Sequence, residues 1–159
     1  MPMTDHDRLF KELLTTFFRE FVELFAPEVA ARVEWPSLRL LDKEVWTDVT
    51  EGERHEADLV ALADVRGEAS CFLIHVENQA SRHAEFGQRM FHYFARLHER
   101  HRMPIYPIAV FSYDKPRKAE PDSYHVVCPP LAVLDFRFQV VQLNRLRWRD
   151  YAKQQIDVR

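Results

Sequence analysis

The chain has 159 residues, of which 47% are hydrophobic, 13% aromatic and 30% charged. This composition is typical of one folded domain of ordinary size and excludes a disordered or fibrous chain. The net charge of −3 with neutral histidines and the sequence pI of about 6.2 argue against a large, non-specific DNA-binding surface.

Neither a membrane span nor a secretory signal is apparent. No stretch approaches the ~18 consecutive apolar residues that cross a bilayer, and residues 1–10 are too acidic and polar for a signal peptide. We therefore expect a cytoplasmic protein without membrane association. Cys71 and Cys128 lie far apart and have no CxxC spacing, so we expect both to be buried free thiols.

The first half of the chain predicts a helix followed by three strands. Apolar residues recur at intervals of three and four over residues 7–25, which predicts a helix that ends before Pro27, with a further helical turn after it. Three strand-like runs follow, at residues 39–49, 57–65 and 69–79. The short polar connections between these runs favour antiparallel hairpins.

The second half predicts a helix, a buried strand and further strands. The helix covers about residues 84–101, and residues 106–113 are almost wholly apolar, as in a strand buried on both faces. After a loop, two further strands are expected, at residues 125–128 and 134–143. The C-terminal tail, residues 147–159, has the pattern of a helix that begins but stops short. This order predicts a single α/β domain in which helices flank a mixed sheet.

The strand at residues 69–79 ends in polar side chains. His75, Glu77 and Gln79 share one face of that strand by alternation. Such residues are found at strand ends simply because the chain emerges into solvent there, but a functional interpretation depends on what lies opposite.

Asp58 opens the preceding strand and is the residue expected opposite this polar end. A hairpin centred on residue 67 pairs residue 58 with about residue 76, within one residue of Glu77. Neighbouring carboxylates repel each other, and a shared proton or a bound cation relieves the repulsion. Mg²⁺ suits such oxygen ligands, together with water and substrate phosphate.

Several stretches, taken in order, resemble the Rpn-like recombination-promoting nucleases, a transposase-like family of the PD-(D/E)XK nuclease superfamily. The resemblance covers nearly the whole chain and includes Asp58 followed by Glu77-Asn78-Gln79. The resembling stretches are HDRLFKELL (6–14), LDKE (41–44), ADLV (57–60), FLIHVENQ (72–79), RMFHYFARL (89–97), PIYPIAVFSYDKP (104–116) and LNRLRWRDY (143–151).

The resemblance implies a restriction-endonuclease-like core: helix, three-stranded antiparallel meander, helix and strand, with extra C-terminal strands in a mixed sheet. It implies a metal-dependent DNA endonuclease that promotes recombination or transposition, with Asp58 and Glu77 as ligands of Mg²⁺, for which Mn²⁺ is a substitute. Gln79 takes the place of the usual lysine and supplies hydrogen bonds but no charge. The resemblance also implies a C-terminal region beyond residue 151 that residues 1–159 lack.

Other residues have two interpretations. Glu12 and Glu20 are the candidates for an additional acid from the first helix, whereas Asp7 is better suited to capping that helix. His75 either donates to the site or packs against a helix. Arg89 and His92 either contact DNA phosphates or are solvated, and the same choice applies to the basic clusters at 96–102 and 145–149.

Two functions therefore remain open. One is a nuclease whose partner is DNA, and cleavage of two strands favours a homodimer with an interface near the aromatic C-terminal region. The alternative is a catalytically lapsed domain that acts as a binding or assembly module, which the near-neutral charge and Gln79 favour.

Overall fold

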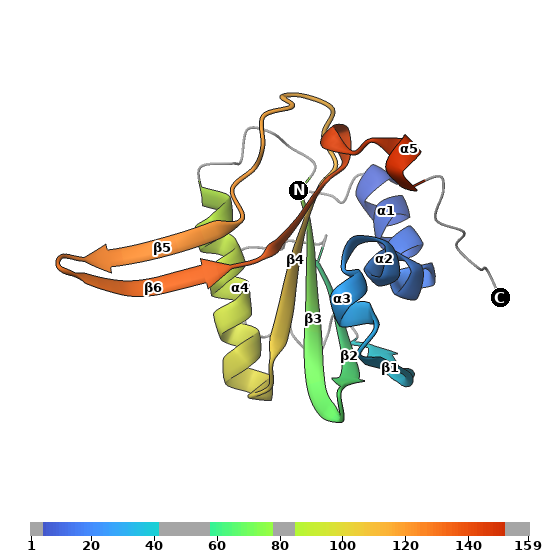
Figure 1. Ribbon diagram of the computed structural model, residues 1–159, viewed down its shortest axis with the longest axis horizontal. Coiled ribbons are helices and arrows are strands. Elements are labelled where there is room, and N and C mark those ends of the chain that lie inside the picture. The colour runs from blue at the N-terminus through green and yellow to red at the C-terminus, as the bar shows by residue number, and fades with distance from the viewer. Residues whose placement is uncertain (1–4, 42–57, 78–84, 152–159) are drawn as a thin grey trace.

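A computed structural model describes residues 5–41, 58–77 and 85–151, without the side chains of residues 5–7, 58 and 148 (Figure 1). Its centre is a five-stranded mixed sheet in the order β1-β2-β3-β4-β7. The first three strands form an antiparallel meander, and β4 and β7 are added parallel to β3. The strands of this sheet are β1 (Val33–Leu40), β2 (Asp58–Val65), β3 (Glu68–Glu77), β4 (Ile105–Phe111) and β7 (Gln139–Gln142).

Helices cover both faces of this sheet. One face carries α1 (Asp5–Thr16), α2 (Phe18–Phe25) and α3 (Pro27–Ala30), and the other carries α4 (Phe86–His101) (Figure 1). The predicted order of helix, meander, helix and strand is therefore confirmed, as is the α/β class. None of the helices in the described ranges is long and apolar enough to cross a membrane.

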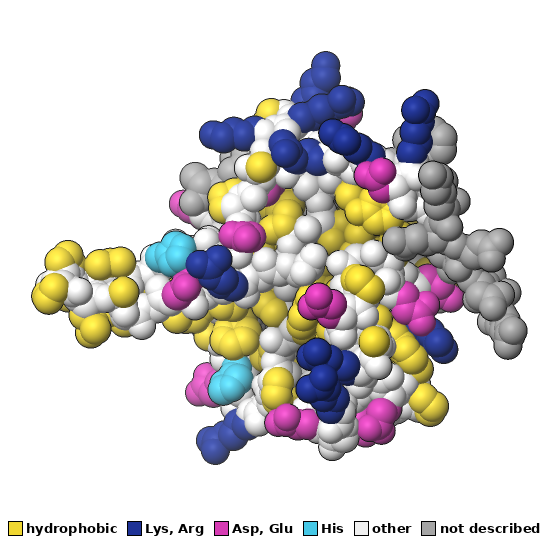
Figure 2. Space-filling view, in the orientation of Figure 1, with side chains coloured by type: hydrophobic (Ala, Val, Ile, Leu, Met, Phe, Trp, Pro, Cys, Tyr) yellow, Lys and Arg dark blue, Asp and Glu magenta, His cyan; other side chains and the backbone are white. Residues whose placement is uncertain are grey.

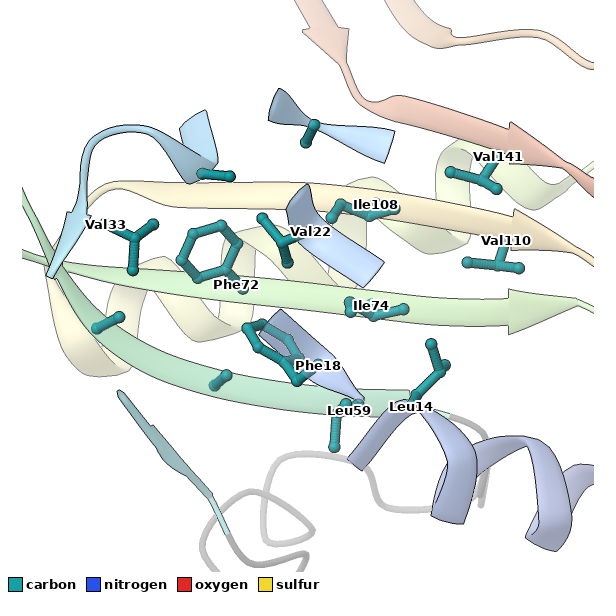
Figure 3. Packing of buried hydrophobic residues seen from close by; sticks show 14 of the residues in the cluster. Leu14, Phe18, Val22, Val33, Leu59, Phe72, Ile74, Ile108, Val110 and Val141 are labelled. Carbon is teal, nitrogen blue, oxygen red and sulfur yellow. The ribbon is translucent and has the colours of Figure 1, made fainter. Parts of the chain in front are cut away.

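The predicted helix over residues 7–25 is two helices with a kink at Phe17. The hydroxyls of Thr15 and Thr16 donate to the carbonyls of Lys11 and Glu12, at 2.8 Å each. Such back-bonding bends helices, and Phe17 leaves helical geometry with ψ at 35°. The apolar stripe nevertheless continues across the kink, and Figure 3 shows Leu14, Phe18 and Val22 lying over the sheet.

Alternation along the central strands divides the core into two layers. Ile108 and Val110 of β4 face the layer under α1 and α2, whereas Ala109 and Phe111 face the layer under α4. All four side chains are almost wholly buried, which confirms that this strand is covered on both faces.

The β2–β3 hairpin is confirmed, but its expected register is wrong by one residue. Arg66 and Gly67, both at positive φ (53° and 80°), form a two-residue turn closed by the pair Val65 and Glu68. Residue 58 therefore lies opposite His75 rather than residue 76. The prediction assumed a three-residue turn, which shifts the register.

The first predicted strand is also displaced. β1 overlaps the predicted range 39–49 only at Arg39 and Leu40, and residues 42–49 lie outside the described residues. Pro36 lies inside β1, where the register shifts between Glu34 and Arg39. Proline is tolerated there because β1 is an edge strand with an irregular ladder.

The predicted strand over residues 134–143 is two strands separated by Phe138. Only the second of them, β7, joins the central sheet. The first, β6 (Leu131–Arg137), pairs with β5 (Ser123–Cys128) in a separate two-stranded sheet, so the expected extra strands enter the mixed sheet only in part. The chain then forms a 3₁₀ turn, η4 (Leu143–Arg145), and a short helix, α5 (Trp148–Tyr151).

Cys71 is buried as expected, but the prediction is wrong for Cys128, which is exposed. Cys128 ends β5 in the two-stranded sheet, where no other described element covers it, whereas Cys71 lies in a central strand between two helical layers.

Candidate functional site

Glu77 is a buried carboxylate at the last position of β3, with 5% of the residue exposed. It lies opposite Phe111, the last residue of β4, so it marks the edge of the sheet at which both parallel strands end. Burying a charge is costly unless an opposite charge and hydrogen bonds compensate it. This edge therefore contains an acid that the fold keeps at an energetic cost.

Arg89 supplies the compensating charge. Its Nη2 donates to Oε2 of Glu77 at 3.0 Å, and the side chains of both residues are largely buried, 16% and 6% exposed. The Arg89 guanidinium lies 5.8 Å from the centre of the Phe86 ring, one turn earlier on α4. The Glu77–Arg89 pair thus links the end of β3 to the first turns of α4. Arg89 is largely buried rather than solvated, and its contact with DNA phosphates stays a prediction.

His75 is 3% exposed and lies against two rings of α4. The ring of Tyr93 is stacked on it at 5.6 Å, and the ring of Phe86 is tilted at 5.3 Å. Packing against the neighbouring helix is therefore confirmed. The register also places His75 directly opposite Asp58, so it lies between the two acidic positions along the sheet edge.

Asp58 and Gln79, the other two proposed catalytic residues, are described only in part or not at all. The backbone of Asp58 opens β2 opposite His75, but its side chain lies outside the described part of the chain, as does the whole of Gln79. Within residues 5–41, 58–77 and 85–151, no three His, Cys, Asp or Glu side chains gather as metal ligands. The predicted metal site therefore stays a prediction that rests on one described carboxylate and one strand position.

The candidate acids of the first helices are not brought to the face that carries the Glu77–Arg89 pair. Glu12 is exposed on α1 and Glu20 is half-buried on α2, and these helices cover the sheet face opposite α4. His92 lies on α4 but is exposed, with its ring 6.0 Å from that of Phe91. The geometry favours Arg89 over these three as a contributor to the site.

Six exposed cations gather at the edge of the sheet where Glu77 lies. They belong to the loop after β4 and to the segment after β7, whose ends meet because the two strands are parallel. Arg145 Nη1 donates to the carbonyl of Arg117 at 2.7 Å, which ties the two segments together. We call this group the basic ridge, and Figure 2 shows it as the dark blue band along the top: Lys115, Arg117, Lys118, Arg145, Arg147 and Arg149.

The basic ridge changes the inference drawn from overall charge. Residues 114–120 and 143–151 contain these six cations and three acids, Asp114, Glu120 and Asp150, in a chain whose net charge is −3. Only the cluster at 145–149 was apparent as a candidate. The loop at residues 114–120 could have been found from sequence as the other half of the ridge. A segment rich in lysine and arginine follows each of two apolar strands, and segments that follow parallel strands meet at one edge of the sheet.

A concavity lies at the opposite end of the sheet from Glu77. It has a volume of about 380 Å³ and is lined by Arg32, Arg66, Glu68 and Tyr106 among others. Burial raises the pKa of Tyr106, and nearby Glu28 adds to that effect. Its lining mixes cations and acids, and it lies near the start of β3, whereas Glu77 ends that strand. We therefore assign it no part in the site at Glu77.

Comparison with known proteins identifies no relative. No family model, curated protein or solved structure matches the chain.

Proposed function

We propose that this protein is a metal-dependent DNA endonuclease of the PD-(D/E)XK type. The observation that carries the proposal is the coincidence, at one edge of the sheet, of the buried carboxylate of Glu77 and the basic ridge. Clustered lysines and arginines attract the phosphate backbone, and an acid beside them has no role in simple phosphate binding. Glu77 would reconcile the two by helping to hold a metal ion, which would supply positive charge beside the phosphate.

The donor set fits Mg²⁺. This ion is commonly held by one or two carboxylates, with waters and substrate phosphate completing its ligands, and Glu77 with Asp58 on the neighbouring strand supplies that number. Mn²⁺ suits the same oxygen ligands. When bound, the metal supplies charge stabilisation at the phosphate and acidifies a coordinated water.

The chain's own residues would position the reactants. The basic ridge binds the DNA backbone and holds it over the sheet edge, and Arg89 orients Glu77 through its charge-assisted hydrogen bond. Gln79 lies two residues beyond Glu77 in sequence, and its amide can hydrogen-bond a water without adding charge. The burial of His75 against Tyr93 and Phe86 fixes the strand end that carries the acid.

Plasmid cleavage tests this proposal. The wild-type protein is expected to cut or nick supercoiled DNA with Mg²⁺ and to lose that activity in a chelator, and Asp58→Asn is expected to reduce the rate at least about 100-fold, because one of two metal ligands is lost. Full metal-dependent activity in a folded Asp58→Asn protein would exclude the ligand assignment.

The second candidate is a catalytically lapsed domain that binds DNA or assembles with other proteins. The Glu77–Arg89 pair favours it, because an arginine already compensates the acid that a metal would need. Calorimetric titration with Mn²⁺ separates the two functions. A nuclease gives a binding isotherm that Glu77→Gln abolishes, whereas a lapsed domain gives none.

A further inference from the structure

The two-stranded sheet β5–β6 projects from the body of the molecule as an arm. Figure 1 shows it extending from the side that carries α4, and Figure 2 shows hydrophobic side chains clustered at its end. We define the arm as residues 123–137 and its tip as residues 126–134. An isolated two-stranded hairpin is marginally stable in water, so an arm of this kind needs support at its base or from a partner.

Aromatic packing supports the base of the arm. The ring of Phe136 lies 5.5 Å from that of Phe91 and 5.0 Å from that of Phe94, both on α4. Tyr124, opposite Phe136 in the ladder, stacks on Phe91 at 5.8 Å. Gly87 makes room for β5, because an added Cβ would lie 3.3 Å from the Ser123 carbonyl and the Tyr124 Cβ. The arm therefore leaves the body in a defined direction.

The tip is apolar on both faces. Val127 pairs with Ala132, and Cys128 pairs with Leu131 on the next rung, so these two pairs face opposite sides of the ladder. Val127 is 60% exposed and Leu131 65% exposed. An antiparallel sheet that packed one face on the protein's own core and left the other in solvent would be apolar on the covered face only.

The tip carries no charged residue. Residues 126–134 read VVCPPLAVL, and the nearest acidic or basic residues are His125 and Asp135, which flank the tip and lie opposite each other. The outer edges of β5 and β6 pair with no other strand in the part of the chain that the structure describes. Natural edge strands are usually protected by lysines or other charges, which this tip lacks.

We propose that the arm binds a second copy of this chain, arm to arm, so that the two hairpins join edge to edge in one four-stranded sheet. In a two-fold interface each residue meets the same surface of the partner, so a charged tip would repel itself and an uncharged one does not. Edge-to-edge pairing satisfies the open backbone groups, and it brings apolar side chains of the two arms into contact as cross-strand neighbours along the joined edge. The lack of cations in the tip excludes DNA as its occupant.

A second exposed apolar stripe on the same chain is the natural control. Among the described residues, the large exposed hydrophobic side chains form two groups: Val126, Val127, Leu131 and Val133 on the arm, and Leu9 and Leu13 on α1 with Phe17 at the kink after it. The α1 stripe lies on a helix whose backbone is already hydrogen-bonded, and it is flanked by exposed Arg8 and Glu12. The α1 stripe can therefore offer a partner only side-chain contacts, whereas the arm also offers the backbone groups along its open edges.

The test compares two double variants by sedimentation over a concentration series. Leu131→Lys with Val133→Lys places two charges on the arm, where the native side chains are 65% and 55% exposed. Leu9→Lys with Leu13→Lys places the same charges on α1, where exposure is 58% and 53%. We expect a wild-type dimer whose dissociation constant rises about 100-fold or more in the arm variant and less than about threefold in the α1 variant.

Three results would overturn the proposal: a wild-type protein that is monomeric at every concentration, a dimer that survives the arm variant, or a dimer that the α1 variant breaks equally. Sedimentation of the monomer with lipid vesicles would point instead to a membrane surface as the occupant. If the arm variant fails to fold, a measurement on the wild-type protein still tests the proposal. Modification of wild-type Cys128 by a thiol reagent is expected to slow as protein concentration rises, and a constant rate contradicts arm pairing. This inference does not depend on the nuclease proposal.

Discussion

The edge of the sheet at Glu77 and the tip of the β5–β6 arm depart from ordinary burial in opposite directions. At the sheet edge a carboxylate is buried, 5% exposed, where apolar residues are the rule, and at the tip Val127 and Leu131 are 60% and 65% exposed, where charge is the rule. The edge compensates its departure with an arginine on the same chain. The tip has no such compensation in the described residues. This difference is why we propose metal-dependent chemistry on DNA at the first region and a protein partner at the second.

Breaking the Glu77–Arg89 pair should give the largest effect on stability. Arg89→Met removes the cation and leaves a buried carboxylate, so we expect the free energy of unfolding to fall by about 3 kcal/mol, measured by urea denaturation. Arg19→Met is the matched control. Its ion pair with Glu23 is shorter, 2.7 Å, but the side chains are 56% and 42% exposed.

The control should cost no more than about 1 kcal/mol, including the lost contact of Arg19 with Trp35. Equal losses of unfolding free energy in the two variants would mean that the Glu77–Arg89 pair contributes no more than an exposed ion pair on a helix. The contrast between the sheet edge and the arm would then have no energetic basis.

The basic ridge should account for DNA affinity. Lys118→Gln with Arg147→Gln removes two exposed cations, and we expect DNA binding to weaken about tenfold, with the salt dependence reduced by about two phosphate contacts. Arg145 is left intact because it holds Arg117. Fluorescence anisotropy with a labelled duplex over a salt series measures both quantities.

The control removes the same charge elsewhere. Arg96→Gln with Arg100→Gln changes exposed cations in the second half of α4, away from the start of α4, where Arg89 meets Glu77. DNA affinity should be almost unchanged. If both double variants weaken binding equally, attraction is a property of overall charge and the ridge has no special role.

The thiols of Cys71 in β3 and Cys128 in the arm probe the two regions separately. Their modification is the smallest of the effects that we expect. Burial raises the pKa of the Cys71 thiol to about 12, so at pH 8 its thiolate fraction is ~1,000-fold lower than for an ordinary thiol with a pKa of 9.0. In dilute native protein, where the arms are not paired, we expect one rapidly modified thiol per chain, Cys128, and a second only in denaturant. Two rapid thiols would show that β3 is accessible.

The central fold could be predicted because its signals are local. Alternation in residues 57–65 and 69–79 and the helical periodicity of residues 84–101 each depend on neighbours in sequence. The register could not be fixed to the residue, since it depends on the backbone conformations of Arg66 and Gly67. One residue of error changed the partner of Asp58 from residue 76 to His75.

The candidate site could be predicted only in part, because its contacts join distant elements. Glu77 was identified from its position at the end of an apolar strand, but its contact with Arg89 depends on how α4 is rotated on the sheet, which periodicity does not determine. The basic ridge required the knowledge that β4 and β7 are parallel neighbours. The exposure of Cys128 depends on the arm leaving the sheet, and the sequence of β5 resembles that of a buried strand.

Metal-dependent cleavage by a matched pair of variants in β3 tests the central claim most directly. Glu77→Gln and Glu68→Gln make the same change at opposite ends of one strand, at a buried and an exposed glutamate. With both proteins shown to be folded by circular dichroism, we predict that Glu68→Gln cleaves plasmid DNA with Mg²⁺ at the wild-type rate and that Glu77→Gln is at least about 100-fold slower. Wild-type cleavage by Glu77→Gln would contradict the account.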